Sequence, residues 1–150
     1  MRISEEITTL QARIDGEVFA NNSRLIMYST VASAYKESPL SVVYPKSEND
    51  FRELVRYASK RKITLIPRNA GTSLAGQVVG SGIVVDLSRH MTGILEVNAE
   101  ERWVRVQPGV ILDDLNLALK NTGLFFSPET STSNRSMIGG MIGNNSCGLH

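Results

Sequence analysis

The chain has 150 residues, of which 41% are hydrophobic and 21% charged, and its 16 basic and 15 acidic residues give a formal net charge of +1. That size suits one globular domain, and the near-neutral charge argues against nucleic acid or an anionic membrane as a partner. The single cysteine, Cys147, excludes an internal disulfide and a cysteine-based metal site, and the lack of an apolar leader or a bilayer-length apolar run predicts a cytoplasmic protein.

Residues 1–40 are predicted to form a helical extension that precedes the main domain. Apolar residues lie at helical spacing within residues 5–20, which predicts one helix over that range. Residues 21–40 are rich in small residues and show no regular period. The main domain is therefore expected to span residues 41–150.

A strand, a helix and a second strand are predicted at the start of that domain. Val42–Tyr44 form a short apolar run that Pro45 ends, and Ser47 is placed as the N-cap of a helix over residues 48–61. Four apolar positions at i, i+3, i+4 and i+7 give that helix one buried face: Phe51, Leu54, Val55 and Ala58. A strand at residues 64–66 follows directly. Because the connections are short, the two strands are expected to be parallel, with a right-handed crossover.

The rest of the chain continues this alternation and predicts a mixed α/β (α+β) domain. Apolar runs indicate strands at residues 82–87, 94–97, 103–107 and 124–126. A leucine stripe indicates a helix over residues 111–120, between the last two of these strands.

The first segment with a pattern typical of a binding site is PRNAGTSLAGQ, residues 67–77. It follows a strand and offers successive main-chain N–H groups on small residues around Gly71, with the hydroxyls of Thr72 and Ser73 as further donors. Such a concave run of donors suits an anion, for example a diphosphate. The segment has neither a Walker lysine nor a GxGxxG pattern. An ordinary surface turn explains the same residues equally well.

The second such segment is PETSTSNRSMIGGMIGNNSCG, residues 128–148. Ser136 is placed as the N-cap of a short helix that starts at Met137, with free N–H groups that face an anion or a polar ring edge. Two glycines, Gly139 and Gly140, allow another group to approach closely. The alternative is a glycine-rich packing point between helices.

Taken together, the two segments resemble those of a known family. PRNAGTSLAGQ is similar to the pattern PRGxGTSLxGQ, and SMIGGMIGNNSCG is similar to ATIGGMIxNNxxG. Both patterns are typical of the FAD-linked oxidase family, which shares its fold with vanillyl-alcohol oxidase and p-cresol methylhydroxylase. The resemblance extends over residues 40–150, and the second motif looks most like that of D-lactate and D-2-hydroxyglutarate dehydrogenases.

The resemblance implies a vanillyl-alcohol-oxidase-type FAD-binding domain, of which the chain contains the first subdomain and the start of the second. The first motif would hold the FAD diphosphate, and the second would line the adenosine or ribityl part and approach the flavin. The FAD-binding residues implied in this way are Arg68, Asn69, Ala70, Gly71, Thr72, Ser73, Gly76, Gln77, Pro128, Thr130, Ser131, Gly139, Gly140 and Asn144. Asn69 and Ala70 stand where glycine is commoner, which makes the loop slightly bulkier. The family's catalytic residues lie beyond His150, so none is assigned here.

Thr72 implies that FAD is bound without a covalent link. Relatives that attach FAD covalently have a histidine at this loop position, and this chain has a threonine. The two histidines of the chain, His90 and His150, are interpreted as solvated polar residues.

The activity implied by the resemblance is oxidation of a 2-hydroxy acid of the D-lactate, glycolate or D-2-hydroxyglutarate type, by hydride transfer to flavin. Electrons would then pass to a quinone, an electron-transfer flavoprotein or an iron–sulfur module. Two alternatives stay open: a reductase of the same fold that uses flavin and NADPH, and a non-enzymatic module that binds a nucleotide or a partner protein. Because the chain stops directly after a glycine-dense segment, we expect a truncated N-terminal part that is inactive alone and can self-associate through exposed faces.

Overall fold

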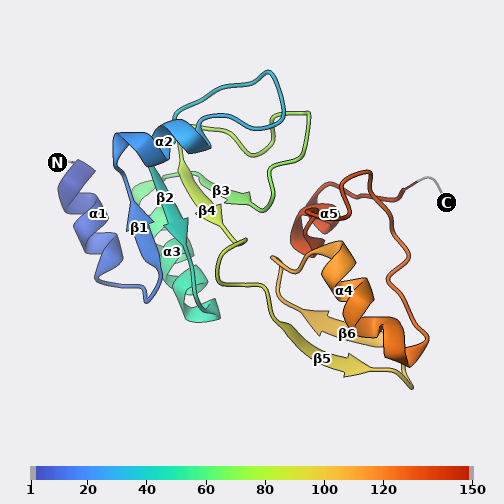
Figure 1. Cartoon of the computed structure of the whole chain (residues 1–150). Coiled ribbons are helices and arrows are strands. Elements are labelled where there is room, and N and C mark those ends of the chain that lie inside the picture. The colour runs from blue at the N-terminus through green and yellow to red at the C-terminus, as the bar shows by residue number, and fades with distance from the viewer. Residues whose placement is uncertain (1–2, 149–150) are drawn as a thin grey trace.

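The computed structural model describes residues 3–148, which form two regions joined by a connecting segment (Figure 1). The four-strand region, residues 3–91, contains the larger sheet and the helices α1 to α3. The two-strand region, residues 94–148, contains a hairpin with α4, a 3-10 turn and α5. Each region has apolar core clusters of its own. The mixed α/β class expected from the sequence is confirmed.

The larger sheet has the strand order β1-β2-β4-β3. Strands β2 (Ser41–Tyr44), β4 (Ile83–Asp86) and β3 (Leu65–Arg68) are parallel, and β1 (Glu17–Phe19) pairs with the edge of β2 in antiparallel orientation. The predicted parallel relation of β2 and β3 is confirmed, with β4 inserted between them. All residues of β2 and β4 are buried, as expected of strands in a sheet that is covered on both faces.

Helix α3 (Glu48–Arg61) connects β2 to β3, and both of its ends follow the signals in the sequence. The Ser47 hydroxyl accepts a hydrogen bond from the main-chain N–H three residues on, at 3.2 Å, and the helix ends at Lys62 in the left-handed conformation. The predicted apolar face is wrong at one position, because Val55 is exposed and Tyr57 is buried instead. Tyr57 belongs to the buried i, i+3, i+4 set that Leu54 begins and Ala58 ends.

Helices cover both faces of the larger sheet. Helix α1 (Ile3–Gln11) and α3 pack on one face, where Leu10 and Leu54 belong to the core. Helix α2 (Asn22–Tyr28) lies on the other face, over a cluster that includes Val84. Within the described residues, no helix is long and apolar enough to cross a bilayer.

The predicted helix over residues 5–20 is wrong in its second half. Helix α1 ends at Gln11, and residues 17–19 form β1. The reason lies at Gly16, where a Cβ would stand 2.4 Å from the Tyr44 carbonyl oxygen. Only glycine allows the chain to pass this close to β2. The close approach ends the helical stretch and places the next residues alongside the sheet edge.

In the two-strand region, β5 (Ile94–Asn98) and β6 (Trp103–Val106) form an antiparallel hairpin, and α4 (Leu112–Leu119) packs against it. A 3-10 turn at Lys120–Thr122 follows, and the short helix α5 (Ile138–Gly143) completes the same core. The two strands and the longer helix match their predicted positions.

The predicted strand at residues 124–126 is wrong, because this stretch pairs with no strand among the described residues. Phe126 packs against the core under α4, and its main-chain N–H donates to Asn116 Oδ1 at 2.7 Å. A side chain of α4 therefore supplies the hydrogen bond that a neighbouring strand would otherwise provide.

His90 is half-buried and paired, so the interpretation of this histidine as solvated is wrong. Its Nε2 lies 2.8 Å from Glu17 Oε1, and Arg89 Nη1 donates to Glu17 Oε2 at 3.0 Å. The hydrogen bond with His90 lowers the pKa of the Glu17 carboxyl below its ordinary value, and the charge of Arg89 adds to this effect. The pairing ties the turn after β4 to the edge strand β1. His150 lies outside the described residues.

Candidate functional site

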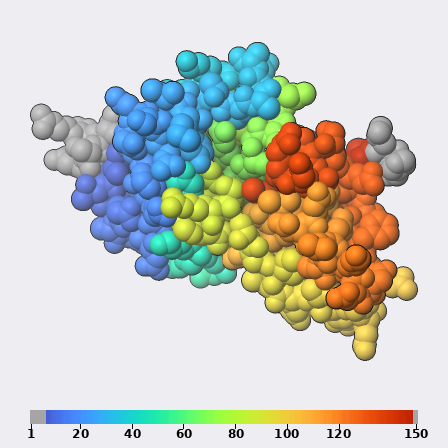
Figure 2. Space-filling model, viewed as in Figure 1, coloured from blue at the N-terminus to red at the C-terminus, as the bar shows by residue number. Residues whose placement is uncertain are grey.

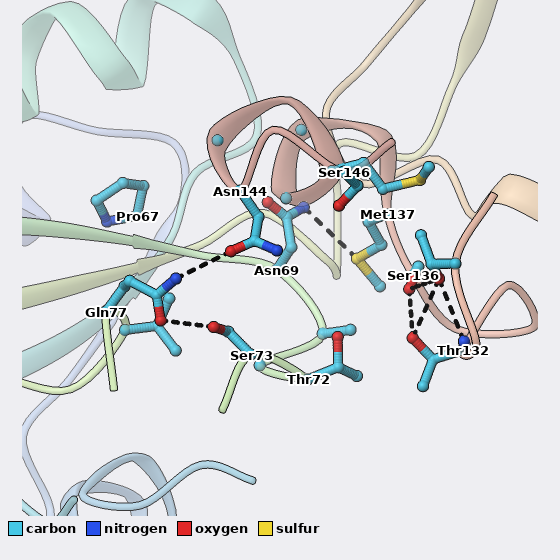
Figure 3. Close-up of a pocket in the computed structure, with 18 of the residues that line it drawn as sticks. Pro67, Asn69, Thr72, Ser73, Gln77, Thr132, Ser136, Met137, Asn144 and Ser146 are labelled. Carbon is cyan, nitrogen blue, oxygen red and sulfur yellow. Dashed lines mark hydrogen bonds between the residues drawn. The ribbon is translucent and has the colours of Figure 1, made fainter. Parts of the chain in front are cut away.

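A cleft of about 380 Å³ lies between the two regions, as Figure 3 shows from close range. Its volume falls within the range of about 300–1,000 Å³ that is usual for small-molecule sites. One wall is the loop after β3, and the other is residues 130–146, which include α5. The lining residues are Pro67, Asn69, Ala70, Gly71, Thr72, Ser73, Gln77, Val78, Thr130, Ser131, Thr132, Ser136, Met137, Gly139, Gly140, Met141, Gly143, Asn144 and Ser146.

The loop wall presents main-chain donors to the cleft. Within the described residues, the N–H groups of Ala70, Gly71, Thr72 and Ser73 donate no hydrogen bond, and all four residues line the cleft. Gly71 has a φ of +66°, in the left-handed region that turns of the anion-binding type use. Main-chain N–H groups without a protein partner at a concave surface are available to a ligand.

Arg68, directly before this loop, turns its side chain away from the cleft. The guanidinium carbon lies 4.8 Å from the centre of the Tyr28 ring. Its Nη1 donates to the main-chain carbonyl of Thr30 at 3.1 Å and to that of Tyr28 at 3.4 Å. Arg68 does not line the cleft, and a direct contact between Arg68 and a diphosphate stays a prediction.

The opposite wall carries a cluster of three hydroxyls. Ser136 Oγ lies 2.5 Å from Thr132 Oγ1 and 2.9 Å from Thr130 Oγ1, so the three side chains share hydrogen bonds. Ser136 is buried by these contacts. The prediction that Ser136 caps the following helix is wrong: Met137 precedes α5, and no side chain caps it.

The first N–H groups of α5 do not face the cleft as free donors. Those of Ile138 and Gly139 donate to the main-chain carbonyls of Val110 and Pro108, both at 2.9 Å. The N–H of Gly140, which lines the cleft, has no such acceptor among the described residues, so a helix start that faces an anion stays a prediction. A Cβ on Gly139 would lie 2.6 Å from the Pro108 side chain, so this glycine serves close packing against the turn after β6, and not between two helices as in the alternative interpretation.

Neutral side chains hold the two walls together. Gln77 Nε2 donates to Asn144 Oδ1 at 3.0 Å, and Gln77 Oε1 accepts from the Ser73 hydroxyl at 2.5 Å (Figure 3). Asn69 Nδ2 donates to the Pro108 carbonyl at 2.9 Å. In Figure 2 the green atoms of the loop accordingly lie beside the red atoms of α5. The bonds of Gln77 to Asn144 and of Asn69 to Pro108 join the loop wall to the two-strand region.

The chemistry that the cleft offers is hydrogen bonding without charge. The lining side chains in the described part of the chain are amides, hydroxyls and apolar groups, and none is ionisable. No group of histidines, cysteines or carboxylates within residues 3–148 is arranged to hold a metal ion. The cleft can bind and orient an organic ligand, and its lining residues include no strong acid or base for proton transfer.

Most of the residues predicted to bind FAD meet at the cleft: Asn69, Ala70, Gly71, Thr72, Ser73, Gln77, Thr130, Ser131, Gly139, Gly140 and Asn144. Arg68, Gly76 and Pro128 do not line it. Gly76 packs under an aromatic ring, since a Cβ there would lie 2.4 Å from Tyr35 Cδ2. The lining also includes eight residues that the sequence analysis did not assign to FAD: Pro67, Val78, Thr132, Ser136, Met137, Met141, Gly143 and Ser146. The run of hydroxyls in TSTSNRS was the signal for two of these.

The fold of this chain also occurs in solved structures of other proteins. An alkyldihydroxyacetonephosphate synthase matches with a TM-score of 0.85 and 21% identity, over 99% of this chain and 33% of that chain. p-Cresol methylhydroxylase matches with a TM-score of 0.70 and 18% identity, over 95% of this chain and 28% of that chain. The chain therefore shares its fold with a part of each of these two proteins.

The family model described as FAD binding domain matches residues 39–150, so the chain belongs to this family. The chain is 44% identical to a D-2-hydroxyglutarate dehydrogenase of Haemophilus influenzae over 89% of its length. It is 34% identical to a glycolate oxidase subunit of Bacillus subtilis over 87%, and 34% identical to a mitochondrial D-lactate dehydrogenase (cytochrome) of Kluyveromyces lactis over 76%. The chain spans only 13%, 28% and 20% of these three relatives, respectively.

Proposed function

We propose that this chain supplies the FAD-binding part of a flavin-dependent dehydrogenase that oxidises a 2-hydroxy acid. The observation that carries the proposal is the row of unbonded main-chain N–H groups at residues 70–73, which line the cleft opposite an uncharged wall of hydroxyls and glycines. The names of the relatives support a substrate of the D-2-hydroxyglutarate, D-lactate or glycolate class. In this proposal residues 41–150 hold the cofactor, and residues 1–40 are an extension that adds β1 to the sheet.

The two walls suit different parts of FAD. Main-chain N–H groups at a glycine turn suit the diphosphate, because they add donors without the bulk of side chains. Thr130 and Ser131 suit the adenosine or ribityl part, and Gly140 and Asn144 suit the flavin. Bound flavin supplies the hydride acceptor for the substrate Cα–H bond. The residues of this cleft bind and orient the cofactor, and we assign no catalytic residue among them.

FAD is held without a covalent bond in this proposal, because Thr72 lines the cleft at the position of the linking histidine. Within residues 3–148 no histidine lines the cleft, and His90 is engaged with Glu17 instead. Acid precipitation of the complete protein should therefore release all of its flavin into the supernatant. Flavin that stays in the washed pellet would contradict this part of the proposal.

The activity is tested by anaerobic reduction of the complete, FAD-loaded protein. D-2-hydroxyglutarate, D-lactate or glycolate should bleach the flavin absorbance, and the L-enantiomers of the first two acids are matched controls. Bleaching by NADPH but by none of the acids would favour a reductase of the same fold. A complete protein that neither retains nor binds FAD would overturn the proposal as a whole.

We expect the 150-residue chain alone to purify without flavin and to lack dehydrogenase activity. The cleft has a loop wall and an α5 wall, and a ligand of the size of FAD needs enclosure on further sides for tight binding. The absorbance spectrum of the purified chain gives the answer directly. Stoichiometric bound FAD would show that the described residues already form the whole site.

A further inference from the structure

A directed chain of hydrogen bonds crosses the α2 face of the larger sheet, outside the cleft. Arg24 Nη1 donates to the Tyr44 hydroxyl at 2.9 Å, and the Tyr44 and Tyr28 hydroxyls lie 2.8 Å apart. The Tyr28 hydroxyl donates to Asp86 Oδ2 at 2.5 Å. Since Tyr28 has one proton and gives it to Asp86, Tyr44 must be the donor to Tyr28.

The series of hydrogen bonds ends on the buried carboxylate of Asp86, which fixes the position of Tyr28. Asp86 is 4% exposed, and its Oδ1 accepts from the main-chain N–H and the hydroxyl of Ser88 at 2.8 and 2.6 Å. Burial and the hydrogen bond to Asp86 raise the pKa of Tyr28, so its hydroxyl stays protonated. Removing a partner of a buried carboxylate is costly, and the tyrosine is therefore held firmly.

Tyr28 in turn holds the arginine that precedes the loop wall. The Arg68 guanidinium stacks on the Tyr28 ring and donates to carbonyls at the end of α2. Arg68 is also the register partner of Asp86 in the β3–β4 ladder. A Cβ on Gly71 would lie 3.1 Å from Arg68 Nη2, so the guanidinium lies directly behind the turn of the loop. The Gly71 carbonyl accepts from the Ala32 N–H at 3.4 Å.

We propose that Arg68 and Tyr28 are positioning residues that hold the turn at Gly71, and with it the N–H groups of residues 70–73, in the geometry that binds a diphosphate. The inference rests on the proposed function, because it assigns these residues a role at the same site. A turn that is braced before the ligand arrives loses less conformational freedom on binding, which raises affinity. The competing hypothesis is that the Arg68 side chain contacts the diphosphate itself.

The first test measures FAD affinity by titration of the complete apoprotein. Arg68→Met should weaken FAD binding about tenfold, the scale of losing hydrogen bonds from a charged donor, and Arg68→Lys should fall between it and the wild type. The matched control is Arg61→Met, because Arg61 also stacks on a tyrosine, 4.0 Å from the Tyr57 ring, and does not line the cleft. The control should change the affinity by less than about twofold. Wild-type affinity in Arg68→Met would overturn the inference.

The second test separates bracing from direct contact by a double-mutant cycle with Tyr28→Phe. If Arg68 acts together with Tyr28, Tyr28→Phe weakens FAD binding in the wild type and adds nothing in the Arg68→Met background. Additive effects would show that Arg68 reaches FAD independently and would overturn the inference. If Arg68→Met does not fold, the same cycle is read with Arg68→Lys. Failure of the wild-type protein to bind FAD would instead overturn the proposed function.

Discussion

The sheets of the two regions beside the cleft are buried to different degrees. In the four-strand region, β2 and β4 are fully buried, and helices cover both faces of the sheet. In the two-strand region, no residue of β5 or β6 is buried, and Leu95 of β5 is 59% exposed. The loop wall of the cleft thus rests on the better enclosed core. Local stability follows enclosure, so the loop wall is expected to be the more rigid half of the site.

Truncation of a core leucine in either region is expected to have the largest effect on stability. Leu54 of α3 is fully buried, and Leu115 of α4 is equally buried. Replacing either one by alanine should cost about 2–5 kcal/mol of stability. If the regions unfold as separate units, Leu54→Ala lowers amide protection in β2 and β4 only, and Leu115→Ala lowers it in β5 and β6 only. Hydrogen exchange measures this, and equal loss in both regions would show one cooperative unit.

Gly71→Val tests whether FAD binding by the loop wall requires the left-handed turn at Gly71. The position has a positive φ and little space for a side chain, so we expect FAD binding by the complete protein to weaken about 100-fold. Gly123→Val is the control, since Gly123 also has a positive φ, at +73°, but nothing lies within 4 Å of its Cβ position. The control should lose stability without losing FAD affinity. If Gly71→Val binds FAD as well as the wild type, the loop does not hold the diphosphate.

Asn144→Ala weakens the connection between the two walls, while the bond from Asn69 to Pro108 remains. The variant removes the partner of Gln77 across the cleft. An exposed neutral hydrogen bond contributes about 0.5–1.5 kcal/mol, so FAD affinity should fall about threefold. Asn98→Ala removes an equally exposed amide contact at the β5–β6 turn and should leave the affinity unchanged. A larger loss of FAD affinity than that of Gly71→Val would show that the α5 wall contributes more to FAD binding than the loop wall.

The smallest expected effect concerns pH and the edge of the four-strand region. The folded state lowers the pKa of Glu17, through His90 first and also through Arg89 and Lys46. The pairing therefore stabilises the fold above the ordinary glutamate pKa and is lost as pH falls through the lower, folded-state value. Glu17→Gln should lose less stability on acidification than the wild type, as measured by urea unfolding across that range. Parallel pH profiles would show that the pair contributes nothing.

Elements with a strong local pattern were predicted correctly, and those that depend on distant contacts were not. Helix α3 follows from its cap at Ser47 and its periodic apolar residues. Strand β1 could not be predicted, because it depends on the approach of Gly16 to Tyr44, far along the chain. Phe126 likewise owes its conformation to the Asn116 side chain on α4.

For the candidate site, the sequence indicated which segments meet but not where their side chains point. Both motif segments line the cleft. Arg68 points away from it, because its partner Tyr28 comes from a helix that showed no pattern in the sequence. Ser136 bonds to Thr132 rather than to the helix start, because the first N–H groups of α5 are already taken by main-chain carbonyls.

The main-chain bonds between α5 and residues 108–112 also bear on the order in which the protein folds. The bridge between Ile111 and Met137 joins residues about 26 positions apart, whereas the β5–β6 hairpin closes over a short turn. Contacts between distant residues form more slowly than local ones. The hairpin should therefore form first and α5 should dock late, so that the cleft acquires its second wall near the end of folding. In pulse-labelling hydrogen exchange during refolding, the amides of Ile138 and Gly139 should become protected after those of β6.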